Sequence, residues 1–333
     1  MATAVPPLVT DDELAALEDL PGKGGRWAVD GVEITVGNLD KVLFPALPGG
    51  GDGGDGGGGG RPEVTKRDLL RYLAQVSGAM LPYFAGRPCN MVRHPNGTDA
   101  AGFWAKAAPK NAPEWMTQWP NEDAAKDETR WYVVVDRPAT LLTMGNLAAL
   151  EYHPWTSSCA RSHEPDWALI DLDPGTETTW EQVVLLAKLH QTALDHLDLQ
   201  AGLKVTGKRG IQIWIPVEPG LGFDDTLAWV EKLSIMVGQL VPDIVSWAWS
   251  KADRGGKARL DYTQNIRNKT LVGPFSPRAS AGGPVSVPLA WDELDAPDLA
   301  PDRWTVHTLP ARLAEVGDPM AHLIGLPQHL PAI

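Results

Sequence analysis

The sequence predicts an α+β fold in which mixed or antiparallel sheets are flanked by helices. Helical patterns at 65–76 and 178–197 occur among strand-like segments, and the two kinds of element do not alternate regularly along the chain. Regular alternation is typical of a doubly wound parallel sheet, so its absence favours a mixed arrangement. The length of 333 residues exceeds that of an ordinary single domain and predicts a bilobal core.

Each predicted helix begins with a capping pattern and continues with apolar residues at helical spacing. The run TKRD opens the pattern at 65–76, so a helix is expected to start near Lys66. Two threonines open the pattern at 178–197. A short helix is expected at 11–20, within an N-terminal arm that we place at 1–32.

The strand-like segments are rich in aromatic and β-branched residues. They lie at 131–135, 167–173, 203–207, 211–217 and 258–262.

Residues 49–60 read GGGDGGDGGGGG and predict a flexible insert, because they carry almost no side chains to bury. A phosphate-binding glycine loop would continue into a GK[ST] helix start, whereas Arg61 and Pro62 follow here. We therefore expect a catalytic domain at 33–320 that carries this insert, and a C-terminal tail at 321–333.

Composition and charge exclude several classes of protein. The net charge is -13, from 29 Lys and Arg against 42 Asp and Glu, which argues against nucleic-acid binding through overall basicity but allows a local basic patch. Cys89 and Cys159 are too few for a disulfide framework and form no CxxC pair. No apolar run is long enough to span a bilayer. We expect a cytoplasmic protein without a membrane anchor.

The segment WALIDLDPG suggests a metal site. Side chains alternate along a strand, so Asp171 and Asp173 lie on one face, at a strand end marked by Pro174 and Gly175. Two close carboxylates repel each other unless protons or cations neutralise them. Their oxygen ligands suit Mg²⁺ or Mn²⁺, and a pair of such ions supports phosphoryl displacement. The alternative is a solvated strand end.

Two later segments add cationic side chains. Thr206, Lys208 and Arg209 lie in a turn between strands, where cations could meet a polyphosphate or simply be exposed in a hairpin. Residues 250–278 hold seven basic and two acidic residues, a local excess of 7 − 2 = +5 that could bind phosphates. Asp261 in this segment could supply a third carboxylate or form a structural salt bridge.

Aromatic residues and a helix start offer two further candidate contacts. Phe103 and Trp104 lie between basic residues and could stack on unpaired bases or belong to the core. The basic residues at the start of the helix near Lys66 are expected to hold an anion together with free backbone amides, unless they are only solvent-facing.

Taken in order, several motifs closely resemble the polymerase domain of bacterial DNA ligase D, which belongs to the archaeo-eukaryotic primase superfamily. The resemblance extends from about residue 33 to residue 320. The motifs are NLDKVLFP, TKRD, GRPCNMVRHPNG, GFWAKAAPKNAPEW, LEYHPW, WALIDLDPG, KVTGKRGIQIW, LDYTQN and GPFSPR followed by GGPVSVPLAWDEL.

The resemblance implies a bilobal primase-polymerase core that adds nucleotides to a primer, prefers ribonucleotides, often uses Mn²⁺ and fills gaps during break repair. It implies that Asp171, Asp173 and Asp261 are the catalytic metal ligands. The residues implied to contact the incoming nucleotide are His153, Thr206, Lys208, Arg209, Gln212, Arg254 and Arg278. Those implied to contact DNA are Lys41 and Lys66, at a downstream 5′-phosphate, and Phe103 and Trp104, at the template.

The chain departs from the family pattern at Thr206 and Gln212, where the family usually has Ser and His, and at Gln264 and Ser280, where relatives can carry arginine. Threonine keeps the hydroxyl, but glutamine carries no positive charge, so nucleotide affinity or its pH dependence would differ. The chain also lacks the KxDG motif of a ligase. A separate ligase, and the end-binding protein Ku, are therefore the expected partners, beside NTP or dNTP and gapped or primer-template DNA at the nucleoid. The alternatives are a primer-synthesising primase, a catalytically weak DNA-end-binding module, and a metal-dependent nuclease or phosphatase.

Overall fold

The computed structural model describes residues 8–49, 60–248, 250–269 and 271–333, so most of the glycine-rich insert expected at 49–60 lies outside the described residues. Helices are mixed with sheets whose named strand pairs are antiparallel, and the α+β class is confirmed. The chain divides into two compact units, each assembled from separate stretches of sequence. Among the described residues, no helix is both long and apolar enough to cross a membrane.

Unit 1 comprises residues 1–154, 272–286 and 304–318. Its helices are α1 (Asp11–Glu18), α2 (Lys66–Met80), α3 (Pro138–Asn146) and α6 (Leu309–Val316). Its strands are β1 (Gly24–Val29), β2 (Val32–Gly37), β3 (Val42–Phe44), β4 (Val64–Thr65), β5 (Cys89–Arg93), β6 (Phe103–Ala105), β7 (Gln118–Pro120), β8 (Trp131–Val133) and β9 (Ala149–Pro154). The largest sheet of this unit has the order β6-β5-β9, with β6 at one edge.

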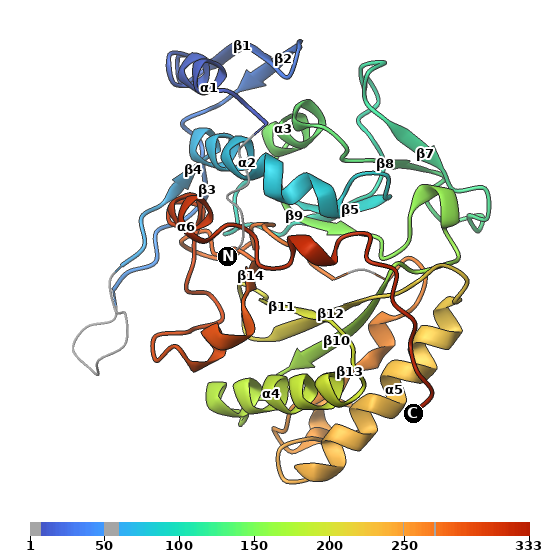
Figure 1. Ribbon diagram of the computed structural model, residues 1–333. Helices are drawn as coiled ribbons and strands as arrows, with labels where there is room; N and C mark the ends of the chain where they lie inside the picture. Colours follow the sequence, from blue (N-terminus) through green and yellow to red (C-terminus); the bar gives the residue numbers. More distant parts are fainter. Residues whose placement is uncertain (1–7, 50–59, 249, 270) are drawn as a thin grey trace. The chain divides into compact units, whose positions relative to one another are not determined.

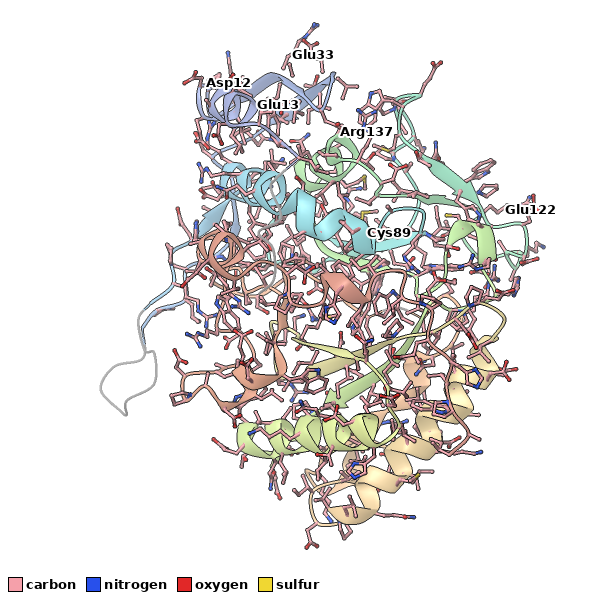
Figure 2. All side chains as sticks on the ribbon, in the orientation of Figure 1. Asp12, Glu13, Glu33, Cys89, Glu122 and Arg137 are labelled. Carbon is pink, nitrogen blue, oxygen red and sulfur yellow. The ribbon has the colours of Figure 1, made fainter. Side chains whose placement is uncertain are left out.

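The interior of unit 1 is built from large apolar side chains on α2, β5 and β9. Tyr72 on α2 is fully buried, and its hydroxyl donates to the carbonyl oxygen of Phe275 at 2.6 Å. Cys89 is also fully buried, at the start of β5, whereas Asp12 and Glu122 lie at the periphery (Figure 2). The segment 272–286 is thus hydrogen-bonded into unit 1 although it follows most of unit 2 in the sequence.

Unit 2 comprises residues 155–271, 287–303 and 319–333. Its elements are β10 (Trp167–Asp173), α4 (Trp180–His196), β11 (Gly202–Val205), β12 (Ile211–Pro216), α5 (Phe223–Leu240), β13 (Arg259–Asp261) and β14 (Val287–Leu289). The strands form one antiparallel sheet of order β13-β10-β12-β11-β14. Helices α4 and α5 pack against β10, and α4 also packs against β12 (Figure 1).

The predicted elements recur with small differences in length. Thr65 and Thr179 cap α2 and α4 as expected, because each hydroxyl accepts a hydrogen bond from the amide three residues later. The strands expected at 167–173, 203–207, 211–217 and 258–262 are β10 to β13. Within the expected N-terminal arm, α1 and β1 are formed and Trp27 is 1% exposed, whereas the hairpin partner β2 extends beyond residue 32 into the expected catalytic domain.

Candidate functional site

A row of polar side chains crosses the sheet of unit 2. Asp171 on β10 lies directly opposite Asp261 on β13 and, on its other side, opposite Gln212 on β12. Gln212 lies in turn opposite Lys204 on β11. Directly opposed residues share a face of an antiparallel sheet, and Asp173 shares it through the two-residue strand period. The sheet therefore brings the three predicted carboxylates to one face.

Asp171 lies at the centre of this row, in an unfavourable environment for its charge. Burial raises the pKa of Asp171 to about 7, and repulsion from Asp173 and Asp261 adds to the effect. Gln212 counteracts this rise in pKa, because its Nε2 donates a hydrogen bond to Oδ1 of Asp171 at 3.0 Å. A cation bound at this face would relieve both the burial cost and the repulsion.

Asp173 lies between two guanidinium groups. Arg209 approaches one carboxylate oxygen at 3.5 Å, and Arg254 approaches the other at 3.7 Å. The backbone next to Arg254 is held against the end of β10, because the amide of Glu177 donates to the carbonyl oxygen of Gly256 at 3.0 Å. A Cβ at Gly175 would lie 2.1 Å from that same oxygen, so this close approach requires glycine.

Asp261 is held by its own strand end. Its carboxylate accepts hydrogen bonds from the Thr263 amide at 3.1 Å and from Nε2 of Gln264 at 2.9 Å. The Nε atom of Arg259 lies 3.5 Å from it. Burial disfavours the ionised form, but the hydrogen bonds from Thr263 and Gln264 and the positive charge of Arg259 together outweigh it, so the pKa of Asp261 is lowered. Asp261 is an anionic oxygen donor beside Asp171.

The donor set of the three aspartates fits a hard divalent cation. All three supply carboxylate oxygens, which Mg²⁺ and Mn²⁺ prefer, and the uncompensated charge at Asp171 favours a bound cation. Within the described residues, no group of three or more His, Cys, Asp or Glu side chains is drawn together closely enough to hold a metal ion. Asp173 instead contacts an arginine, and Asp261 contacts threonine and glutamine side chains.

The turn between β11 and β12 is shaped by Thr206. Its Oγ1 accepts hydrogen bonds from the backbone amides of Lys208 at 3.4 Å and Gly210 at 3.2 Å. The side chains of Lys208 and Arg209 are exposed at this turn. The threonine hydroxyl thus stabilises the turn. The two basic side chains are accessible at the same edge of the sheet as Asp173.

A second cluster lies in unit 1, around His153 on β9. The Nε2 atom of His153 lies 3.1 Å from Oε2 of Glu151, and the ring lies edge-on to that of Trp104 at 5.0 Å between centroids. Oε1 of Glu151 lies 3.2 Å from Nε of Arg278. Two predicted nucleotide contacts, His153 and Arg278, are therefore joined by a carboxylate that we did not predict. The strand period could have indicated it, since Glu151 and His153 share a face.

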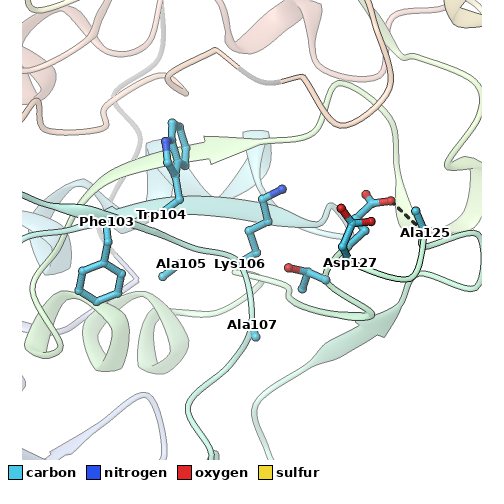
Figure 3. Close-up of a pocket in the computed structure, with 9 residues that line it drawn as sticks. Phe103, Trp104, Ala105, Lys106, Ala107, Ala125 and Asp127 are labelled. Atoms are coloured by element: carbon cyan, nitrogen blue, oxygen red, sulfur yellow. Dashed lines mark hydrogen bonds between the residues drawn. The ribbon is translucent and has the colours of Figure 1, made fainter.

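Phe103 and Trp104 project to opposite sides of the edge strand β6 (Figure 3). Both rings are about half exposed, at 49% and 57%. Trp104 lies on the side of His153, whereas Phe103 lies on the side of Arg93, whose guanidinium is 5.3 Å from its ring. Both line a pocket of about 760 Å³, which the loop at 125–129 completes. Neither ring is a core residue, so the core alternative is wrong for both.

Lys41 and Lys66 lie together where β3, β4 and α2 meet in unit 1. The amide of Lys66 donates to the carbonyl oxygen of Lys41 at 2.9 Å. Burial lowers the pKa of Lys66, and repulsion from the Lys41 ammonium contributes. Nζ of Lys41 donates to the carbonyl oxygen of Pro95 at 2.5 Å. In the described chain, no carboxylate lies within salt-bridge distance of either lysine, so the pair presents uncompensated positive charge.

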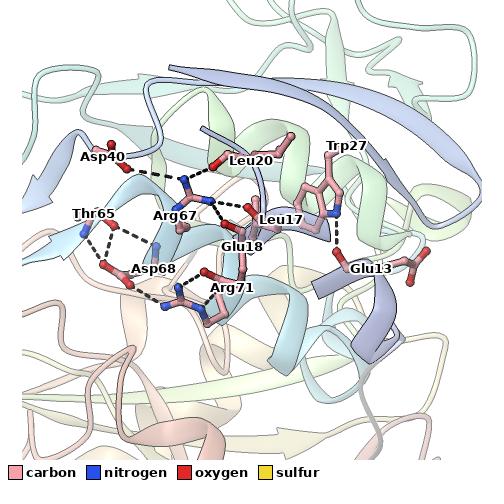
Figure 4. Close-up of polar contacts among 10 residues, drawn as sticks. All are labelled: Glu13, Leu17, Glu18, Leu20, Trp27, Asp40, Thr65, Arg67, Asp68 and Arg71. Carbon is pink, nitrogen blue, oxygen red and sulfur yellow. Dashed lines mark hydrogen bonds and ion pairs between the residues drawn. The ribbon is translucent and has the colours of Figure 1, made fainter. Parts of the chain in front are cut away.

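The prediction that free backbone amides at the start of α2 help to bind an anion is wrong. The amides of Lys66, Arg67 and Asp68 donate to Lys41, Leu39 and Thr65 respectively, so these first helical amides are already used. The Arg67 side chain is bonded to the carbonyl oxygens of Leu17, Glu18 and Leu20 at the end of α1, and Arg71 is paired with Glu18 and Asp68 (Figure 4). Only the two lysine side chains remain to bind an anion.

The basic segment 250–278 contributes less free charge than its composition suggests. Most of its cations are engaged within the protein: Arg254 with Asp173, Lys257 with the Pro242 carbonyl, Arg259 with Asp261, Arg267 with Trp155 and the Ser162 carbonyl, and Arg278 with Glu151. Arg278 also belongs to unit 1, whereas the others belong to unit 2. The segment therefore contributes charged side chains to both units.

The antiparallel sheet, its paired aspartates and the basic turn agree with a nucleotidyltransferase of the primase-polymerase class, to which a family match assigns the chain. A family model described as "LigD, primase-polymerase domain" matches residues 65–320, and the chain belongs to this family.

Relatives of known sequence and structure agree with that assignment. The chain is 31% identical over 273 residues to the multifunctional non-homologous end joining protein LigD of Pseudomonas aeruginosa, covering 81% of this chain and 32% of the relative. It is 28% identical over 296 residues to the bifunctional LigD protein of Bacillus subtilis, covering 88% and 44%. The chain thus spans less than half the length of these relatives.

Among solved structures, the chain is similar to the polymerase domain of Mycobacterium tuberculosis ligase D in complex with DNA. The TM-score is 0.76 and the sequence identity is 26%, over 89% of this chain and 99% of that one. The similarity covers both units of the chain and supports the predicted primase-polymerase fold.

Proposed function

We propose that this protein extends primers and fills short gaps at DNA breaks during non-homologous end joining, with a preference for ribonucleotides. The observation that carries the proposal is the placement of Asp171 opposite Asp261, with Asp173 on the same face. The relatives of Pseudomonas and Bacillus are named for end joining, and the solved relative is a polymerase domain bound to DNA. A gapped duplex with a primer end is therefore the proposed DNA substrate.

In the proposed mechanism, Asp171, Asp173 and Asp261 would hold Mg²⁺ or Mn²⁺, and the bound cation would supply charge stabilisation for the phosphoryl transfer. Arg209 and Arg254 neutralise Asp173, and their guanidinium groups are the proposed contacts to the triphosphate. Gln212 fixes the orientation of Asp171 through its amide hydrogen bond. His153, Lys208 and Arg278 are the further proposed contacts to the nucleotide.

The proposal is tested by extending a labelled primer on a gapped duplex, with ribonucleotides or deoxyribonucleotides, under Mn²⁺ and under Mg²⁺. Lengthening that is faster with ribonucleotides supports it. Shortening of the labelled strand without nucleotides would identify a nuclease instead. Products formed on single-stranded template without any primer would identify a primase.

Replacing Lys66 with alanine should weaken gap filling about tenfold when the gap carries a downstream 5′-phosphate, because a charge-assisted contact to phosphate contributes about 1.5–3 kcal/mol. Lys41→Ala should act in the same direction. Neither variant should change extension when the 5′-phosphate is absent. The measurement is the apparent KM for each gapped DNA. Lys23→Ala, an exposed lysine of the same unit, is the matched control, and an equal loss on both DNAs would refute the assignment.

A further inference from the structure

Glu151 is a buried carboxylate that the proposed mechanism leaves without a task. Its residue is 5% exposed, and each of its two oxygens has a polar partner. Oε1 accepts a hydrogen bond from the amide of Ala279 at 2.9 Å and forms an ion pair with Arg278, whose Nε lies 3.2 Å away. Oε2 lies 3.1 Å from Nε2 of His153. An ionised carboxylate is costly to bury unless it is paired and hydrogen-bonded, and Glu151 meets that condition on both oxygens.

The contact with His153 fixes the protonation of one ring nitrogen. A carboxylate only accepts, so Nε2 of His153 must carry a proton for this hydrogen bond to form. The adjacent negative charge favours the doubly protonated imidazolium over the neutral ring. Glu151 therefore does two things at once: it orients the ring against Trp104, and it stabilises the positive charge on that ring.

Other charged and titratable groups of the described chain lie on the elements next to His153. Arg278, on the segment 272–286, shares Glu151 with the ring and opposes a second positive charge. Cys89 lies on β5, which pairs with β9, and burial raises the pKa of its thiol far above neutral, so it stays uncharged. Asn90, directly opposite His153, is neutral. Lys106, just after β6, lies over the ring of Tyr132 at 6.0 Å. Glu151 is thus an anion bonded directly to His153.

We propose that Glu151 is a positioning residue, which holds Arg278 and a protonated His153 as one cationic unit that binds the phosphates of a nucleoside triphosphate. This inference rests on the proposed function for the nature of the ligand. One carboxylate neutralises one of the two cations, so the unit carries a net positive charge only while the imidazole is protonated. Nucleotide affinity should consequently fall as the pH rises through the titration of His153.

The test is the dissociation constant for ATP with Mg²⁺, measured between pH 5.5 and 9 for the full chain and for Glu151→Gln. The introduced side-chain amide would offer its Nε2 as a donor to His153, which favours the unprotonated ring nitrogen. We expect about tenfold weaker binding near neutral pH, because a hydrogen bond to a charged group contributes about 1.5–3 kcal/mol. We also expect the loss of affinity with rising pH to begin about one pH unit lower.

Two further variants separate positioning from a structural role. Asp318→Asn neutralises another buried carboxylate of unit 1, which accepts from the hydroxyl of Tyr83 at 2.8 Å, and should leave the pH profile unchanged. In a His153→Gln background, the pH step should be absent and Glu151→Gln should cause no shift. Thermal unfolding of each variant shows whether it is folded.

The outcomes are distinct from those that test the proposed function. An unshifted pH profile in folded Glu151→Gln, or the same shift in Asp318→Asn, would overturn the role of Glu151. Wild-type protein that binds ATP with the expected pH dependence but never extends a primer would leave Glu151 in place and refute the polymerase. Wild-type protein whose ATP affinity does not change with pH would overturn the inference even if extension is normal.

Discussion

Replacing Asp171 with asparagine should reduce primer extension by about 1000-fold or more under either Mg²⁺ or Mn²⁺. A bound metal contributes several kcal/mol of transition-state stabilisation, and each 1.36 kcal/mol corresponds to a factor of ten in rate. Asparagine keeps the shape of the side chain and an oxygen that accepts from Gln212, but it removes the central negative charge of the row. Affinity for gapped DNA should change little. The measurements are single-turnover extension and DNA binding.

Asp243→Asn is the matched control for this variant, because it neutralises an exposed carboxylate of the same unit. It should extend primers at the wild-type rate. In metal-free buffer, Asp171→Asn should be at least as stable as the wild-type protein, since it removes a buried charge that repels Asp173 and Asp261. Extension by Asp171→Asn at a near wild-type rate with Mn²⁺ would show that these carboxylates do not hold the catalytic metal.

The second large effect concerns stability in mild acid and arises at His190 on α4. The ring is fully buried, Nδ1 contacts the carbonyl oxygen of Leu186 at 2.8 Å, and Nε2 has no hydrogen-bond partner among the described atoms. Burial lowers the pKa of His190 to about 4, against 6.5 ordinarily, and the contact with Leu186 only partly opposes this. The unfolded chain therefore binds a proton between these two pH values that the folded protein excludes.

This difference in bound protons determines the direction in which the free energy of unfolding changes with pH. Stability conferred by a neutral His190 is fully present above pH 6.5 and falls as the pH drops toward 4, by about 3 kcal/mol in total. His190→Leu should lack this component, so its unfolding free energy should fall less than that of the wild-type protein between pH 7 and 4. Urea unfolding at several pH values measures the difference.

His196→Leu provides the control for His190. His196 lies on the same helix and makes the same contact with the carbonyl oxygen four residues earlier, at 2.7 Å to Thr192, but it is exposed. Its replacement should leave the pH dependence of unfolding unchanged. If the free energies of unfolding of the wild-type protein and His190→Leu change with pH in the same way, protonation of the buried ring does not destabilise the fold, and the prediction is wrong.

Local patterns predicted the elements of this fold because the forces that start and end them are local. The capping boxes at Thr65 and Thr179 are formed as expected, and β10 carries the alternation that places Asp171 and Asp173 on one face. The sequence also allowed a prediction of the third carboxylate. Asp261 ends a strand-like segment, and an antiparallel neighbour could bring it opposite Asp171.

The ion pairs could not be predicted in the same way, because they join residues far apart in the sequence. Glu151 and Arg278 are 127 positions apart in the sequence (278 − 151). No local sequence pattern favours their contact over other pairings. The free amides expected at the start of α2 are absent for a similar reason. Backbone carbonyls of Leu39 and Lys41, which precede the glycine-rich insert, reach these amides first.

The pairing of β10 with β13 has a consequence for how this protein can vary. Neighbouring strands are spaced at about 4.7–4.9 Å by their backbone hydrogen bonds, whatever side chains they carry. The distance between the backbones that bear Asp171 and Asp261 is therefore set by the sheet itself. Loops around that sheet can change in length or charge, and such changes can alter the choice of substrate. The spacing between the two strands that carry the aspartates stays constant.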